Sequence, residues 1–249
     1  MSCTDKSKTG KAGKSDPFWN SVASFDLDEI FVLPGWISKL RGERNTSDRD
    51  IISVSIDSEL EALKTRVGDC SGCRLSAERN SIVFGGGNPA AGIVIIGEGP
   101  GANEDKLGKP FVGRAGKLLD RILAAIDLDR TSVFITNIVK CRPPGNRTPS
   151  KDEVAACLWI LEEQIKIMNP GVILTLGAPA SRTIIGSTDG IGKLRGSIHR
   201  YGEIPVIPTY HPAALLRTDA LRRPVWEDMK MLKQLLLELG LPRTEKDQA

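Results

Sequence analysis

Four short apolar runs, separated by segments with helical spacing, constrain the fold of this chain more than any other feature. The runs are Ile93–Ile96, Val133–Val139, Val172–Leu176 and Ile204–Tyr210. Runs of this kind are typical of strands buried on both faces of a sheet. Helices are expected at Ser58–Val67, Ala115–Ile126, Lys151–Met168, Ala178–Ile185 and Trp226–Leu239. Strands that alternate with helices indicate an α/β fold, with a parallel sheet covered by helices on both faces.

Composition separates an N-terminal extension from the expected domain. The chain has 249 residues, which is enough for one large α/β domain and an extension. Residues 1–55 are assigned to the extension, because its beginning is rich in Lys, Ser, Thr and Gly and resembles a disordered tail. The domain is expected at 56–241, followed by a C-terminal tail at 242–249. No apolar run approaches the roughly 20 residues that span a bilayer, and no secretory signal is found, so a cytoplasmic protein with no membrane partner is expected.

Polar side chains follow the predicted strands at the edge where those strands end. The first run leads into Gly97–Gly101, in which Glu98 is the one carboxylate. Glycines let a ligand approach the backbone closely, and ligands of open parallel sheets bind just beyond the strand ends. Asn137 and His211 follow two further runs, so we expect these polar groups to converge on one crevice. Phe111 lies in a glycine-flanked loop, either as a loop anchor or as a stacking platform.

Basic residues are distributed unevenly, although the net charge of +3 decides little by itself. They gather after the glycine loop, after the second run and after the last run: Lys106, Lys109, Arg114, Lys117; Lys140, Arg142, Arg147, Lys151; Arg217, Arg222, Arg223. Because parallel strands end at one edge of the sheet, these clusters predict a positive rim for a phosphate backbone. The alternative is a scattered, solvated surface.

Four of the five cysteines form a pattern that indicates a metal site. Cys70 and Cys73 make a C-x2-C pair, Cys141 and Cys157 follow, and Cys3 lies apart in the tail. In a cytosolic chain this pattern favours a metal over disulfides. Four thiolates suit Zn²⁺ or an iron–sulfur cluster, and spacing alone does not choose between them. A redox C-x2-C pair and a chance arrangement are the weaker alternatives.

Three segments resemble the signature motifs of the family 4 uracil-DNA glycosylases. They are GEGPGANEDKLGKPFVGRAGKLLD, NIVKCRPPGNRTP and HPAALLR, in that order, with the cysteines interleaved. The resemblance covers about residues 70–237. It implies a three-layer α/β/α fold with a four-stranded parallel sheet, and hydrolysis of the N-glycosidic bond between uracil and deoxyribose in DNA. It also implies one [4Fe–4S] cluster, held by Cys70, Cys73, Cys141 and Cys157.

The resemblance further implies a role for each candidate site residue. Glu98 and the Gly99 backbone hold the attacking water. Phe111 stacks on uracil, Asn137 pairs with its edge, and His211 faces its O2 side. The expected partner is uracil-containing DNA, and the protein is expected to be a monomer.

Two positions depart from the family's usual motifs. The family usually reads GEAPG, where this chain has Gly99, a change expected to loosen the loop. It often reads HPSP, where this chain has Ala213 and Ala214 after His211-Pro212, which removes a hydroxyl. A related family captures DNA covalently through a histidine after the second motif. Residues 141–150 contain no histidine, so turnover is expected here.

Two other functions compete with this hypothesis. One is a non-catalytic iron–sulfur module that binds nucleic acid and senses uracil in the same pocket. The other is a Rossmann-type oxidoreductase, against which the glycine loop lacks G-x-G-x-x-G in register.

Overall fold

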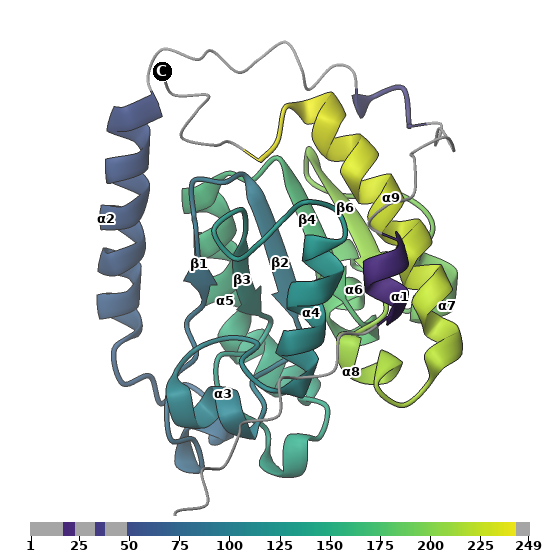
Figure 1. Cartoon of the computed structure of the whole chain (residues 1–249). Helices are drawn as coiled ribbons and strands as arrows, with labels where there is room; N and C mark the ends of the chain where they lie inside the picture. The colour runs from purple at the N-terminus through teal and green to yellow at the C-terminus, as the bar shows by residue number, and fades with distance from the viewer. Residues whose placement is uncertain (1–16, 23–32, 38–48, 243–249) are drawn as a thin grey trace, which may run out of the picture.

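A twisted sheet organises the computed structural model, which describes residues 17–22, 33–37 and 49–242 (Figure 1). Within these ranges six strands lie in the order β1-β3-β2-β4-β6-β5. The four central strands run parallel, whereas β1 and β5 pair antiparallel at the two edges. The bounds are β1 Gly86–Gly87, β2 Ile93–Gly97, β3 Phe134–Asn137, β4 Val172–Leu176, β5 His199–Tyr201 and β6 Ile204–Thr209.

The predicted α/β fold and its four parallel strands are confirmed. Each of the four apolar runs contains one central strand, and β2 and β4 are buried along their whole length. The edge strands lie outside the predicted set, because two or three residues are too few to show a strand pattern. The sheet is therefore larger than expected, with two antiparallel additions to the parallel centre.

Helices cover both faces of the sheet, as predicted (Figure 1). The α-helices are α1 Pro17–Val22, α2 Arg49–Val67, α3 Ala102–Leu107, α4 Arg114–Ala124, α5 Lys151–Met168, α6 Ala178–Ile185, α7 Ile191–Leu194, α8 Pro212–Leu215 and α9 Arg222–Leu239. Short 3₁₀ turns are η2 Arg74–Ala77, η3 Pro144–Asn146 and η4 Asp219–Leu221. None of the helices in the described ranges has the length and apolar character needed to cross a membrane.

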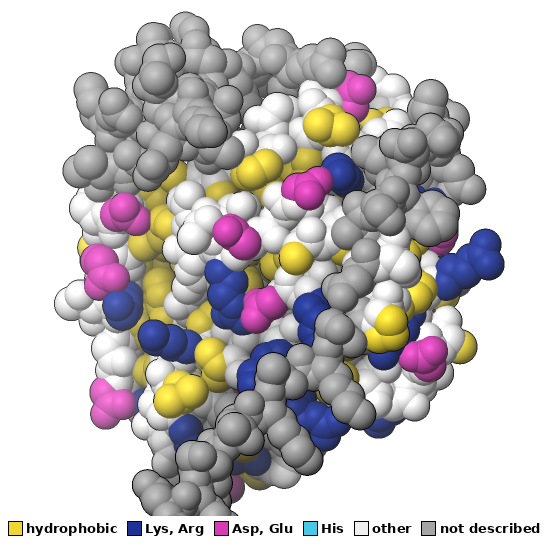
Figure 2. Space-filling view, viewed as in Figure 1, with side chains coloured by type: hydrophobic (Ala, Val, Ile, Leu, Met, Phe, Trp, Pro, Cys, Tyr) yellow, Lys and Arg dark blue, Asp and Glu magenta, His cyan; other side chains and the backbone are white. Residues whose placement is uncertain are grey.

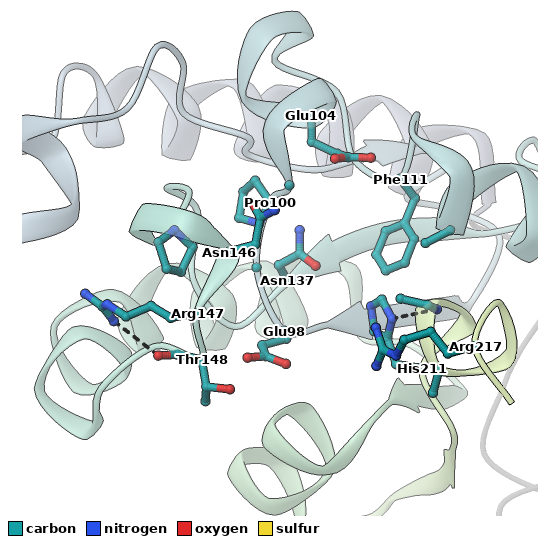
Figure 3. Close-up of a pocket in the computed structure, with 16 residues that line it drawn as sticks. Glu98, Pro100, Glu104, Phe111, Asn137, Asn146, Arg147, Thr148, His211 and Arg217 are labelled. Atoms are coloured by element: carbon teal, nitrogen blue, oxygen red, sulfur yellow. Dashed lines mark hydrogen bonds between the residues drawn. The ribbon is translucent and has the colours of Figure 1, made fainter.

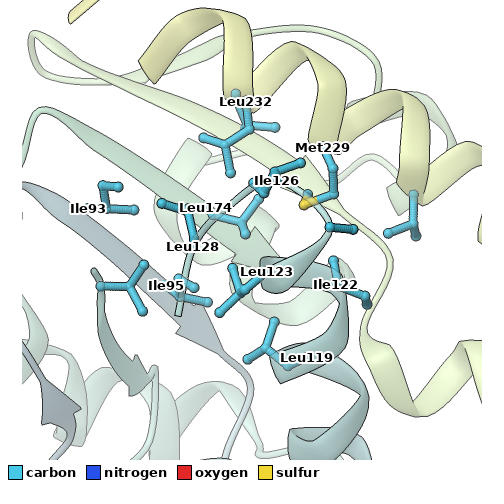
Figure 4. Packing of buried hydrophobic residues seen from close by; sticks show 14 of the residues in the cluster. Ile93, Ile95, Leu119, Ile122, Leu123, Ile126, Leu128, Leu174, Met229 and Leu232 are labelled. Atoms are coloured by element: carbon cyan, nitrogen blue, oxygen red, sulfur yellow. The ribbon is translucent and has the colours of Figure 1, made fainter. Parts of the chain in front are cut away.

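Alternate side chains of β2 divide the core into two layers. Ile93 and Ile95 pack with α4 and α9 on one face (Figure 4). Val94 and Ile96 point to the other face, where they pack with α2, α5 and α6. Because both faces of the strand are covered, a continuous apolar run is needed to form it. This packing fixes the strand ends, from which the polar side chains project.

Local signals set the helix ends to different degrees. Helix α5 coincides with its predicted range, because Ser150 and Glu153 form a capping box at its start. Helix α6 also coincides with its prediction, whereas α9 begins at Arg222, four residues before the predicted Trp226. Helix α2 begins at Arg49 rather than Ser58.

Part of the predicted N-terminal extension packs against the domain. Trp19 is 2% exposed and lies in the same apolar cluster as α4 and α9, together with Val22 and Ile37. Helix α2 runs through the predicted boundary between residues 55 and 56. The predicted disordered start and most of the predicted tail at 242–249 lie outside the described residues. The division into extension, domain and tail stays a prediction.

Candidate active site

A cavity of about 460 Å³ lies where β2, β3 and β6 end, and it brings together every candidate site residue outside the cysteines. Glu98, Gly99, Phe111, Asn137 and His211 all line it (Figure 3). The remaining lining residues are Pro100, Gly101, Glu104, Ala115, Pro143, Asn146, Arg147, Thr148, Ala213, Ala214 and Arg217. The predicted convergence on one crevice is thus observed.

The glycine loop allows close packing below the cavity. A Cβ at Gly97 would lie 2.4 Å from Asn137 Oδ1 and 2.7 Å from the Phe111 ring. A Cβ at Gly99 would lie 2.9 Å from Val139 Cγ2, so glycine there lets the loop approach β3 closely. Glycine at position 99 therefore serves packing, where the sequence alone suggested only a looser loop.

Asn137 is the most deeply buried polar side chain facing the cavity. It ends β3, is 1% exposed, and its Oδ1 has no hydrogen-bond partner among the described residues. A buried amide oxygen without a partner costs about 1–3 kcal/mol. Such a cost is typical of a group that accepts a hydrogen bond from a ligand when the ligand binds.

Phe111 is held in a conformation that few non-glycine residues adopt. Its φ is +51°, and the side chain is 6% exposed. Glu104 Oε1 accepts hydrogen bonds from the N–H groups of Val112 and Gly113 at 2.8 and 2.7 Å. Arg130 donates to the carbonyl groups of Pro110 and Phe111. Glu104 thus orders the loop, and the ring is fixed as one wall of the cavity.

His211 caps α8 and lies opposite Phe111. The two ring centroids are 5.5 Å apart and the planes are inclined by 32°. His211 Nδ1 accepts a hydrogen bond from the Ala213 N–H at 3.1 Å, so the proton of the neutral ring is on Nε2. Burial, and then the positive charge of Arg217, lowers the pKa of His211 to about 4. His211 is therefore a neutral donor at physiological pH.

Glu98 lies at the end of β2 with a carboxyl that is partly removed from water. Burial raises the pKa of Glu98, and a hydrogen bond with the Thr148 side chain opposes the rise. Thr148 lies inside the second motif but is not among the predicted site residues. Glu98 remains the one candidate for a carboxylate base among the predicted site residues.

Basic side chains gather on the half of the molecule at which the strands end (Figure 2). Lys106, Lys109, Arg114, Lys117 and Arg217 are exposed there, in keeping with the predicted rim. Arg147 lines the cavity but is paired with Glu153 through two hydrogen bonds of 2.7 and 2.8 Å.

The prediction that Lys140 belongs to the positive rim is wrong. Lys140 is 1% exposed, because its ammonium is enclosed by hydrogen-bond acceptors below the sheet edge. The other histidine also has a structural environment: His199 Nε2 lies 2.8 Å from the Leu194 carbonyl oxygen, which joins β5 to α7.

The four predicted metal ligands line a second, smaller pocket. Cys70, Cys73, Cys141 and Cys157 surround a space of about 20 Å³ together with Arg79 and Lys140. Each of three sulfurs faces a nitrogen donor: the Gly72 N–H for Cys70, Arg79 for Cys141, and the Lys140 N–H for Cys157. Burial raises the pKa of Cys141 to about 11 and also raises that of Cys157. Across the described ranges, no group of three or more His, Cys, Asp or Glu side chains has the geometry of a single-ion site.

Comparison with known proteins relates this chain to a family of DNA-repair enzymes. A family model described as "Uracil DNA glycosylase superfamily" matches residues 84–230. A type-4 uracil-DNA glycosylase of Thermotoga maritima is 47% identical over 185 residues, which is 73% of this chain and 96% of that protein. Type-4 uracil-DNA glycosylases of Sulfurisphaera tokodaii and Saccharolobus solfataricus are each 45% identical, over 72% and 71% of this chain and 85% and 86% of those proteins.

Proposed function

Because this chain belongs to the uracil-DNA glycosylase superfamily, we propose that the cavity at the ends of β2, β3 and β6 binds a flipped-out deoxyuridine. The protein is a uracil-DNA glycosylase, which hydrolyses the N-glycosidic bond and leaves an abasic site in DNA. The observation that carries the assignment of the cavity is the buried Asn137 Oδ1, which has no partner among the described residues.

Asn137 reads the uracil edge in this proposal. Its Oδ1 accepts from uracil N3–H, while its amide NH₂ donates to O4. Cytosine presents the opposite pattern and would leave buried groups unpaired, which is the arrangement that gives strong discrimination. Phe111 stacks on the base, and base–aromatic stacking contributes about 1–3 kcal/mol toward the cost of flipping.

His211 and Glu98 act on the two sides of the bond that breaks. Negative charge develops on the uracil ring, and the Nε2–H of neutral His211 donates to O2. Glu98 and the Gly99 backbone hold the water that attacks the sugar. Because Glu98 is partly desolvated, its carboxylate is a stronger base than an exposed one. These roles use only residues that line the same cavity.

The cysteine pocket fits an iron–sulfur cluster, with Cys70, Cys73, Cys141 and Cys157 as ligands. The fit rests on the four sulfur donors around one space and on the N–H donors that face three of them. When bound, the cluster would supply a covalent tie between the chain before β1, the loop after β3 and α5.

The proposed site also suggests the binding partner of the protein and its cellular compartment. In this proposal Arg217 of the cavity wall and the exposed basic residues that follow the strand ends bind the phosphates on either side of the flipped nucleotide. Thiols that ligate a cluster are kept in that state by a reducing compartment, so the cytoplasm is the proposed location. The predicted monomer is testable by size-exclusion chromatography.

The test is incubation of the purified protein with uracil-containing oligonucleotides, single- and double-stranded, with free uracil and abasic sites as readouts. We expect uracil release, its loss in His211→Ala, and its retention in His199→Ala as the matched histidine control. A protein that binds these strands but releases no uracil would instead be a sensing module. Iron content and visible absorbance of the native chain and Cys157→Ala test the cluster separately, since the variant should lose both.

A further inference from the structure

A buried ion pair contacts the end of β6, outside the cavity that holds the site residues. Asp228 of α9 is completely buried, and its carboxylate accepts from Arg195 Nη2 at 2.8 Å and from Arg195 Nε at 3.0 Å. Arg195 follows α7, and its side chain is 19% exposed. Neither residue lines the cavity, so the pair takes no direct part in the steps described above.

The Asp228 carboxylate joins three parts of the chain. Its Oδ2 also accepts from Thr209 Oγ1 at 2.6 Å, and its Oδ1 accepts from the Gly196 N–H at 3.2 Å. Arg195 in turn donates to the Pro224 carbonyl oxygen. The pair thus fastens β6 to α9 and to the segment after α7. A buried ion pair adds little net stability compared with apolar residues of the same size, so what it contributes is fixed geometry.

The geometry fixed in this way is that of the backbone leading to His211. Thr209 is the last residue of β6, two positions before His211. The guanidinium carbon of Arg195 lies 5.9 Å from the ring centroid of Tyr210, the residue between them. The Gly177 N–H donates to the Thr209 carbonyl oxygen at 2.8 Å, and a Cβ on Gly177 would lie 3.1 Å from His211 Cβ. The strand end is therefore held from α9, from Arg195 and from the end of β4.

We propose that Asp228 and Arg195 act as a positioning pair for His211. They hold the two residues before it and so set the place of the imidazole. The inference deepens the proposed function, because it rests on the role given there to His211 as the donor to uracil O2. A donor to a developing charge has its full effect only at hydrogen-bond distance, so a small shift of the strand end lowers the rate. The pair also accounts for a carboxylate on the buried face of α9.

The first test compares Thr209→Val with Thr175→Val in kinetics on a uracil oligonucleotide. Thr209→Val removes the hydroxyl that bonds Asp228 and leaves the ion pair in place. We expect kcat to fall by about tenfold and KM to change by less than about twofold, because the other site residues keep their places. Thr209→Ser restores the hydroxyl and should recover most of the lost kcat. Thr175 is the matched control, since it is also fully buried and bonds Ser181 Oγ at 2.9 Å, and its variant should keep the wild-type kcat.

Double variants separate a displaced His211 from general destabilisation. If the effect passes through His211, Thr209→Val should cost less than about twofold in a His211→Asn background, because a contact is lost only once. It should keep its full cost in an Asn137→Ala background. A cost in the His211→Asn background as large as in the wild type would overturn the positioning role.

A spectroscopic readout tests the same point without activity. The chain has two histidines, so the imidazole signals in ¹⁵N NMR can be assigned with His199→Ala. Thr209→Val should shift the His211 signals, and Thr209→Ser should leave them near their wild-type values. Unchanged His211 signals or a wild-type kcat in folded Thr209→Val would overturn the proposal.

The pair can be replaced as a whole if Thr209→Val does not fold. Arg195→Met combined with Asp228→Leu leaves no unpaired buried charge. This double variant should show the same loss of kcat and the same dependence on His211, and a wild-type kcat would contradict the positioning role. Wild-type uracil release by His211→Ala would instead refute the proposed function, whichever way the other variants behave.

Discussion

Gly97 and Asn137 are packed so closely that a Cβ on the glycine would lie 2.4 Å from the amide oxygen of the asparagine. The two residues end the neighbouring parallel strands β2 and β3, where they are paired in register. The position of the Asn137 amide, which we propose reads uracil, is thus set by the absence of a side chain on the neighbouring strand.

Gly97→Ala should displace Asn137 or the Phe111 ring and so lower kcat/KM for uracil excision by about 10- to 100-fold. Steady-state kinetics on a uracil oligonucleotide measure the loss. Gly190→Ala is the control, because a Cβ there meets nothing within 4 Å. Equal activity of Gly97→Ala and wild type would show that Asn137 is not held by this contact.

The pKa of about 4 for His211 predicts that its charge does not change between pH 5 and pH 8. His211→Asn should lower kcat by about 10²–10³-fold, in the range found when a donor to a developing oxyanion is removed. The loss should be nearly constant from pH 5 to 8 in single-turnover assays. A loss that grows toward low pH would instead indicate a charged histidine.

The same pKa shift predicts a stability change. The unfolded chain takes up a proton near the ordinary histidine pKa of 6.5, before the folded state does near 4. Stability should therefore fall as the pH decreases from about 6.5 to 4. His211→Asn should show a shallower fall than wild type in urea unfolding across this window.

The raised pKa of Glu98 predicts an acid limb in the pH profile of kcat/KM at a pH above the ordinary carboxyl value of 4.5. The hydrogen bond with Thr148 lowers this pKa, so Thr148→Val should move the limb to higher pH. Glu98→Gln should remove the limb together with most of the activity. A limb that stays in place in Thr148→Val would separate it from Glu98.

Arg217 is the exposed cation of the cavity wall for which the described part of the chain offers no ion-pair partner. Arg217→Ala should weaken DNA binding and reduce the slope of log K against log salt by about 1, as for the loss of one phosphate contact. Fluorescence anisotropy over a salt series measures the slope. Lys166→Ala, far along α5, should leave the slope unchanged.

The sequence was sufficient to predict the centre of the sheet and the set of residues around the cavity. Each central strand is buried on both faces, so it requires an apolar run that stands out from its surroundings. Glu98, Asn137 and His211 could be grouped because parallel strands end at one edge. The edge strand β1 consists of Gly86 and Gly87 alone, which carry no side-chain pattern.

Lys140 shows why other features of the structure could not be predicted from the sequence. Its sequence neighbours suggest one more surface cation after a strand. Its burial depends on Thr136, four residues away, and on Gln164, which comes from α5. Only the packing of α5 on the sheet brings these acceptors together, and no local pattern reports it.

The conformation of Phe111 also bears on how this protein can evolve. A non-glycine residue at φ +51° holds strain of about 1–3 kcal/mol, which Glu104 and Arg130 must outweigh. Glycine at position 111 would relieve that strain, but the loss of a ring that is 6% exposed costs about 3–5 kcal/mol. The packing of the ring therefore outweighs the strain of its backbone, so selection for a stable core and selection for the cavity wall favour the same residue.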